Sequence, residues 1–155
     1  MGTRTIKTLP FGMEADLTAG SQEEYKAQWN AKQLNLRKFR LLGWILRAEI
    51  PNSYYGSSNE CHIMKNYTDL RECVPGVGGP MSTVTKGDGL IASVGLFNQG
   101  GDSGTQTPIG LVHNLPEAIE FDRDDTLAIH IIFVNKAGSK VRFELYGSFI
   151  IEAID

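Results

Sequence analysis

The sequence predicts an all-β protein that folds as a single antiparallel β-sandwich or barrel. Apolar and polar residues alternate along the C-terminal segment 141–154, as in a strand with one buried face. The apolar runs are short and bounded by turn formers, and the 155 residues include 17 glycines and 6 prolines. No helical pattern alternates with these runs, which argues against a βαβ fold.

Composition excludes several classes of protein. The hydrophobic fraction of 41% and charged fraction of 21% are typical of a globular domain. A net charge of −3 gives no reason to expect nucleic-acid binding. No segment approaches the roughly 20 apolar residues of a membrane helix, and Met1–Pro10 lacks the apolar core of a secretory signal. We therefore expect no membrane partner and no export by that route.

Charge is uneven along the chain. Residues 1–50 hold eight Lys and Arg against five Asp and Glu, whereas residues 51–155 hold seven against thirteen. An imbalance this small is common on an ordinary solvated surface, which is the interpretation we favour. The alternative is that subunits contact each other head to tail through these opposite charges.

The N-terminal part is expected to divide at residue 20. Residues 1–20 lack clear periodicity and are interpreted as an arm, and residues 21–155 as one domain. Residues 21–33 fit either a helix or an extended strand, because Ser21 and Glu24 have the spacing of a capping box.

The middle of the chain is expected to contain strands separated by a long loop. Residues 38–50 form an apolar strand in which Trp44 shares a face with Leu42 and Leu46. Residues 51–87, rich in turn formers, are interpreted as an excursion that reaches a neighbouring subunit. Further strands are expected at 90–97 and 118–121.

The C-terminal strands 127–134 and 141–154 are joined by a short polar turn that contains a glycine, which predicts an antiparallel hairpin. Alternation in the last strand places Phe143, Leu145 and Phe149 on its buried face. Gly147 falls on the same face and indicates a bulge or a close backbone approach.

Several short motifs match patterns of catalytic or metal-binding sites, but each is better explained as ordinary loop or core structure. Ser103, in a Gly-Asp-Ser-Gly tetrapeptide, could form a protease triad with His62 and Asp88, but the chain is too short for the two barrels of that fold. The zinc candidates lack paired ligand spacing; they are Cys61, His62, Cys73 and His113. Free thiols are favoured, with a Cys61–Cys73 disulfide as the alternative.

Residues 122–125 are acidic but lack the pattern of a calcium loop, so a solvated turn is expected. We predict no enzymatic activity, no cofactor and no metal site.

Aromatic and apolar residues in the arm and the long loop are the candidate contact residues. They are Tyr54, Tyr55, Phe11, Leu17 and Tyr67. An alternative is a sugar-stacking platform that includes Tyr54 and Tyr55, in which case the protein would be a carbohydrate- or receptor-binding sandwich.

Two segments resemble a known class of protein. They are "LNLRKFRLLGWILRAEI" at 34–50 and "LPEAIEFDRDDTLAIHIIFVNKAGSKVRFELYGSFI", within 115–150. Both are similar to strands of small jelly-roll structural proteins of bacteriophage virions, of the minor capsid, penton or decoration (cement) type. The resemblance implies a jelly-roll sandwich, made in the host cytoplasm and placed in the virion. It also implies a homo-oligomer, trimer or pentamer, that binds a major capsid protein.

Overall fold

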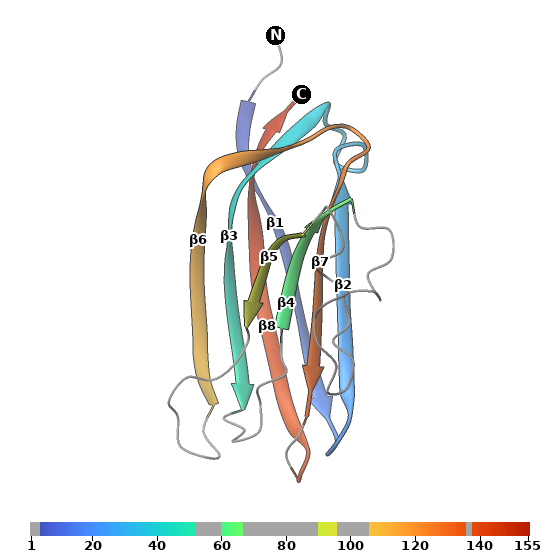
Figure 1. The fold of residues 1–155 in the computed structure, drawn as a ribbon, viewed down its shortest axis with the longest axis vertical. Helices are drawn as coiled ribbons and strands as arrows, with labels where there is room; N and C mark the ends of the chain where they lie inside the picture. The colour runs from blue at the N-terminus through green and yellow to red at the C-terminus, as the bar shows by residue number, and fades with distance from the viewer. Residues whose placement is uncertain (1–3, 52–59, 67–89, 96–105, 136–137) are drawn as a thin grey trace.

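The computed structural model describes residues 4–51, 60–66, 90–95, 106–135 and 138–155 (Figure 1). These residues form eight strands in two four-stranded sheets. The strands are β1 (Arg4–Leu17), β2 (Gln22–Asn30), β3 (Lys38–Pro51), β4 (Glu60–Lys65), β5 (Leu90–Gly95), β6 (Gln106–Phe121), β7 (Thr126–Val134) and β8 (Val141–Ile154). The described residues contain no helix, and so none that could cross a membrane.

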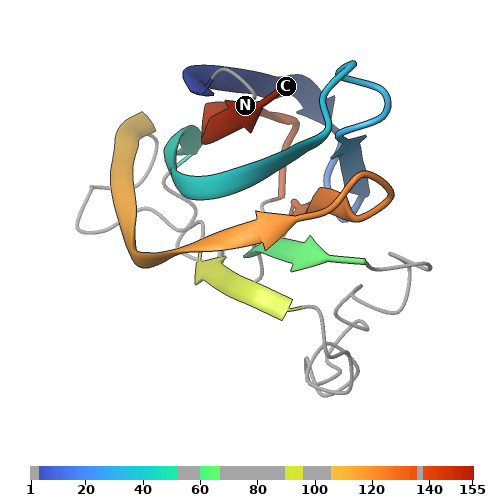
Figure 2. The same ribbon diagram turned by 90° about the horizontal axis from the view of Figure 1, so that it is seen from above.

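The order of the strands defines a jelly roll. Sheet A has the order β1-β8-β3-β6 and sheet B the order β2-β7-β4-β5. The antiparallel pairs β1·β8, β2·β7, β3·β6 and β4·β5 are those of one long hairpin that has been rolled into two layers (Figure 2). Eight strands in two such sheets are the jelly-roll form of the β-sandwich, as the resemblance implied.

The core fills the space between the sheets. Side chains from the inner faces of both sheets form one buried cluster, including Leu41, Phe143 and Phe149 of sheet A and Ile129 and Ile131 of sheet B. Alternation along β8 buries Phe143, Leu145, Phe149 and Ile151, which confirms the face predicted for this strand.

Gly147 interrupts that face because backbone approaches it closely. A Cβ atom at Gly147 would lie 2.4 Å from the carbonyl oxygen of Ile45 and 2.6 Å from the Phe11 ring. The close approach predicted at this position is therefore confirmed, and only glycine fits it.

A bulge changes which residues of β3 face the core. The register of β3 against β6 and β8 shifts between Leu41 and Gly43. Phe39 and Leu41 before the shift, and Trp44 and Leu46 after it, are therefore all buried. Strict alternation would place Phe39 and Leu41 on the face opposite to Trp44, but the one extra residue of the bulge reverses the parity of the strand.

The N-terminal segment differs from the expectation of an arm. Residues 4–17 form β1, which pairs with β8 over its whole length. Its odd positions from Leu9 to Leu17 are apolar and turn toward the core, a periodicity that begins only after a polar start. Residues 22–30 form β2, so the extended alternative holds for this segment and the helix does not.

The last two strands do not form a hairpin with each other. β7 lies in sheet B, between β2 and β4, and β8 lies in sheet A, between β1 and β3. The short connection between them crosses from one sheet to the other, as a jelly roll requires. The length of a turn alone does not distinguish such a crossing from the turn of a hairpin.

The remaining expectations hold in part. β5 begins at Leu90 as expected, and β4 lies inside the segment 51–87 that was interpreted as a loop. β6 is much longer than the short strand expected at 118–121, although it contains Pro108 and Pro116. It lies at the edge of sheet A, where proline is tolerated because one side of the strand needs no partner.

Candidate interaction surface

The outer face of sheet A carries the exposed apolar side chains of the described part of the chain. Ile6 is 60% exposed, Ile45 43% and Tyr146 42%, and these are the large hydrophobic side chains of the described residues that are most exposed. They belong to three neighbouring strands: Ile6 lies opposite Glu152, and Ile45 opposite Ser148, both on β8. Ile45 and Tyr146 are near neighbours on this face and Ile6 lies further along it, so one sheet face carries all three exposed apolar side chains.

One end of this face, the basic end, carries three cations and two carboxylates. Arg4 and Arg40 flank Glu152, with nitrogen–oxygen distances of 3.8 and 3.5 Å. Lys38 Nζ lies 2.5 Å from a carboxylate oxygen of Glu120 and lowers the pKa of that group through this hydrogen bond.

The opposite end, the acidic end, carries three carboxylates around one guanidinium. Arg142 donates to Glu14 at 2.6 Å and to Glu144 at 2.8 Å, and lies 3.4 Å from Asp16. The Tyr146 hydroxyl also donates to Glu14, and this contact, followed by Arg142, lowers the pKa of Glu14. Glu14 in turn raises the pKa of Tyr146 to about 12, which keeps the hydroxyl a donor.

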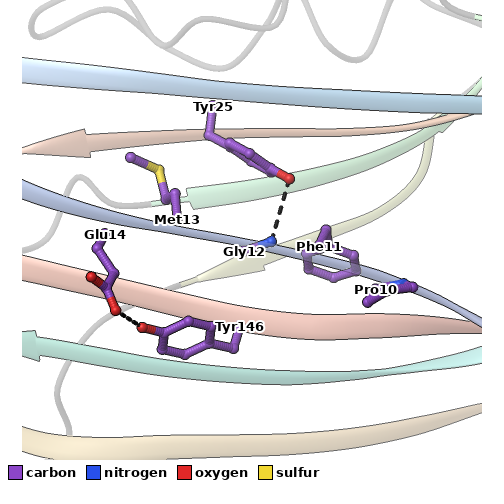
Figure 3. Close-up of a pocket in the computed structure, with 7 residues that line it drawn as sticks. All are labelled: Pro10, Phe11, Gly12, Met13, Glu14, Tyr25 and Tyr146. Carbon is purple, nitrogen blue, oxygen red and sulfur yellow. Dashed lines mark hydrogen bonds between the residues drawn. The ribbon is translucent and has the colours of Figure 1, made fainter.

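A shallow groove lies on β1 beside the acidic end, with a volume of about 590 Å³. Its lining consists of Pro10, Phe11, Gly12, Met13, Glu14, Tyr25 and Tyr146. Glu14 and Tyr146 lie on one side of β1 and Met13 and Tyr25 on the other (Figure 3). The N–H of Gly12 donates to the Tyr25 hydroxyl at 3.3 Å. The side chain of Tyr25 on β2 therefore contacts β1 at Gly12, where β1 has no side chain.

The outer face of sheet B is different, because its described central residues are buried. His62 of β4 and His130 of β7 lie directly opposite each other, with exposures of 1% and 0%. His130 Nε2 lies 2.6 Å from a carboxylate oxygen of Glu24. Burial lowers the pKa of His62 to about 4, with a further contribution from His130. Burial also lowers the pKa of His130, against the opposing effect of Glu24.

The structure separates the contact residues proposed from the sequence. Phe11 and Leu17 are 7% and 4% exposed and belong to the core, so their side chains are not presented to a partner. Tyr54, Tyr55 and Tyr67 lie outside the described residues. The sugar-stacking alternative therefore stays a prediction.

The zinc candidates do not converge where they are described. Cys61 and His62 are consecutive residues of β4 and point to opposite faces, with Cys61 in the core. His113 stacks on Trp44 with a centroid distance of 4.6 Å, and Cys73 lies outside the described residues. The Cys61 thiol is free, and burial raises its pKa. Among the described residues, no group of three His, Cys, Asp or Glu could hold a metal ion.

The acidic turn at 122–125 is closed by its own hydrogen bonds. The Asp125 carboxylate accepts from the Asp122 N–H and from the Asn66 amide, both at 2.8 Å. These contacts lower the pKa of Asp125 and explain the acidic residues as a turn. Ser103 and Asp88, the protease candidates, lie outside the described residues.

Sequence reasoning missed the outer face of sheet A. The apolar residues at 6, 45 and 146 are far apart in the chain and come together only through pairing with β8. A signal was present in one strand, since Tyr146 has the parity of the polar residues Arg142, Glu144 and Ser148. A large apolar residue among solvent-facing neighbours marks a candidate contact.

The described residues form an eight-stranded jelly-roll sandwich, and solved structures similar to the chain include a viral capsid protein and proteins of other viruses. A decameric BFDV capsid protein is 9% identical over 96% of this chain and 99% of its own, with a TM-score of 0.41. VP2 of an infectious bursal disease virus subviral particle is 12% identical over 96% of this chain, with a TM-score of 0.36, and this chain spans 32% of its length. A structure of desmodium yellow mottle tymovirus is 13% identical over 99% of this chain and 89% of its own, with a TM-score of 0.34.

No protein-family model matches the chain, and no curated protein matches its sequence. The assignment to the jelly roll rests on the strand order of this chain, since each of these TM-scores lies below 0.5.

Proposed function

We propose that the protein is a structural subunit of a virion that acts through protein–protein contacts and not through catalysis. The observation that carries the proposal is the outer face of sheet A. On a jelly-roll frame, this face exposes Ile6, Ile45 and Tyr146 between two charged ends. Jelly rolls serve in viral capsids among other roles, and exposed apolar residues within a polar rim are typical of contact surfaces.

The specific role within this proposal is that of a capsid-associated subunit, of the decoration (cement), minor capsid or penton type, in a bacteriophage. Its partners would be copies of itself and a major capsid protein. The resemblance of residues 34–50 and 115–150 to such proteins supports this role.

Copurification tests the proposal. Particles of the virus that encodes the chain are banded on a density gradient and searched for the chain by mass spectrometry. Particles that lack the chain are then incubated with the purified wild type or with Ile45→Arg. We expect the wild type to be present in the bands and to bind, and Ile45→Arg to bind at least tenfold more weakly.

The matched control is Gln28→Arg, which places the same charge on an exposed residue of β2 in sheet B. It should bind like the wild type. Absence of the chain from purified particles, with no binding on addition, would contradict the proposed function.

A further inference from the structure

We propose that the outer face of sheet A binds a second copy of this chain, with the two faces related by a two-fold axis that crosses the strands. The inference deepens the proposed function by naming the partner of one surface. It relies on that proposal only in treating the outer face of sheet A as a contact surface.

Opposite charge at the two ends of the face favours this arrangement. The basic end carries Arg4, Lys38 and Arg40 against two carboxylates, and the acidic end carries three carboxylates against Arg142 and Arg47. A two-fold axis across the strands places the basic end of each copy over the acidic end of the other. An axis along the strands would place like ends together, which costs free energy.

The apolar contacts of β1 are reciprocal under the same symmetry. This axis lays β1 of one copy over β1 of the other in the opposite direction. When Arg4 of one copy lies over Glu14 of the other, the midpoint falls at position 9, and Ile6 then lies over Gly12. The Tyr146 ring lies beside Gly12, 3.0 Å from where a Cβ atom would stand, so the most exposed apolar side chain of one copy contacts this ring in the other. Each copy contributes both Ile6 and Tyr146 to the two equivalent contacts.

The size of the face is sufficient for a specific dimer. A strand of about 14 residues that rises about 3.3 Å per residue sets the length of the sheet. Four such strands about 4.8 Å apart form a face on the order of 900 Å². A standard specific interface buries roughly 800 Å² on each partner. Ile45 lies next to the midpoint, which aligns with Trp44 of β3, so charge sets the orientation while Ile45, Ile6 and Tyr146 supply apolar contact.

Charge reversal in the full chain tests the arrangement by sedimentation velocity over a range of concentrations. The wild type should show a monomer–dimer equilibrium whose dissociation constant rises with salt. Arg4→Glu alone and Glu14→Lys alone should each raise the dissociation constant at least tenfold, because each opposes like charges twice per dimer. The double variant Arg4→Glu/Glu14→Lys should return to within about threefold of the wild type, because both opposing pairs are restored.

Ile6→Arg tests the apolar contact. Its side chain is 60% exposed, so the variant should fold like the wild type and fail to dimerise. Gln28→Arg is the matched control and should dimerise normally. Circular dichroism and thermal unfolding establish that each variant is folded.

Two results overturn the inference: a wild type that stays monomeric up to several hundred micromolar, or a dimer that neither charge reversal nor Ile6→Arg weakens. Either can occur while the chain is still found in purified particles, which would leave the proposed function standing. A dimer with the expected variant pattern and no binding to particles would support the inference and contradict the proposed function.

Discussion

The side-chain amide of Asn135 donates a hydrogen bond of 2.9 Å to the carbonyl oxygen of Leu17, 118 residues earlier in the chain. The same amide nitrogen lies within hydrogen-bonding distance of the carbonyls of Thr18 and Ser139. The backbone of Asn135 also exchanges hydrogen bonds with Gly20 and Ser21. One buried residue therefore joins the β1–β2 connection to the β7–β8 connection, where the chain twice crosses between the sheets.

Asn135→Ala is expected to lower the free energy of unfolding by about 2–3 kcal/mol, because it removes the side-chain donor to the buried carbonyl oxygen of Leu17 and two further contacts between the crossovers. Urea unfolding followed by circular dichroism measures the change. Ser139→Ala is the control, because that exposed residue contributes its backbone carbonyl to this contact, which alanine keeps. Equal stability of the two variants would mean that the amide does not hold the crossovers together.

Phe11→Ala is expected to lower the free energy of unfolding by about 3–5 kcal/mol. Its ring lies 5.1 Å from that of Phe149 and 6.4 Å from that of Trp29, centroid to centroid, under the β1 edge. Ile6→Ala, on the same strand with an exposed side chain, should change stability by less than about 0.5 kcal/mol. Thermal and urea unfolding of both variants check this. A stable Phe11→Ala that loses only binding would restore the interpretation of Phe11 as a contact residue.

The strands that sequence reasoning predicted best are those in which one local signal suffices. β8 alternates over its whole length, and its buried residues follow directly from parity. β1 was missed because its apolar alternation begins only at Leu9, after an exposed polar start that includes Lys7 and Thr8. β6 was predicted only at 118–121. It tolerates Pro108 and Pro116 because it lies at the edge of sheet A, a position that the sequence does not reveal.

Non-local choices were beyond sequence reasoning for a physical reason. The bulge between Leu41 and Gly43 reverses which residues of β3 are buried, and nothing in the local pattern announces it. Whether a short turn closes a hairpin or crosses between sheets depends on which strands are already neighbours. The candidate surface has the same origin, since Ile45 and Tyr146 share a face only because β3 pairs with β8.

Gly147→Ala is expected to lower the free energy of unfolding by about 2–3 kcal/mol or to prevent folding. The added methyl group would lie 2.4 Å from the carbonyl oxygen of Ile45, and backbone in a central sheet position cannot move away cheaply. Gly138→Ala is the matched control, because nothing lies within 4 Å of a Cβ atom there. Soluble yield and thermal unfolding of the two variants provide the comparison. An unchanged unfolding temperature for Gly147→Ala would contradict the close approach of β3 and β8.

His62 is expected to make the protein less stable as pH falls from about 6.5 toward 4. Burial lowers the pKa of His62 in the folded chain to about 4, whereas a histidine in the unfolded chain titrates near 6.5. Between these values the unfolded chain binds a proton that the folded chain does not. The free energy of unfolding therefore decreases by up to about 1.4 kcal/mol for each unit that pH falls. His130, whose pKa is also lowered, adds to the decrease.

Urea unfolding between pH 7.5 and 5 isolates this effect, because the carboxylates with lowered pKa values, such as Glu24, titrate below that window. His62→Gln should reduce the slope of stability against pH, since the proton-binding difference at this position is removed. The wild type and His62→Gln are compared at each pH, so that the change in slope is assigned to this one residue. A wild type with equal stability at pH 7.5 and 5 would contradict the burial of the histidine pair, because a buried neutral imidazole cannot avoid this proton linkage.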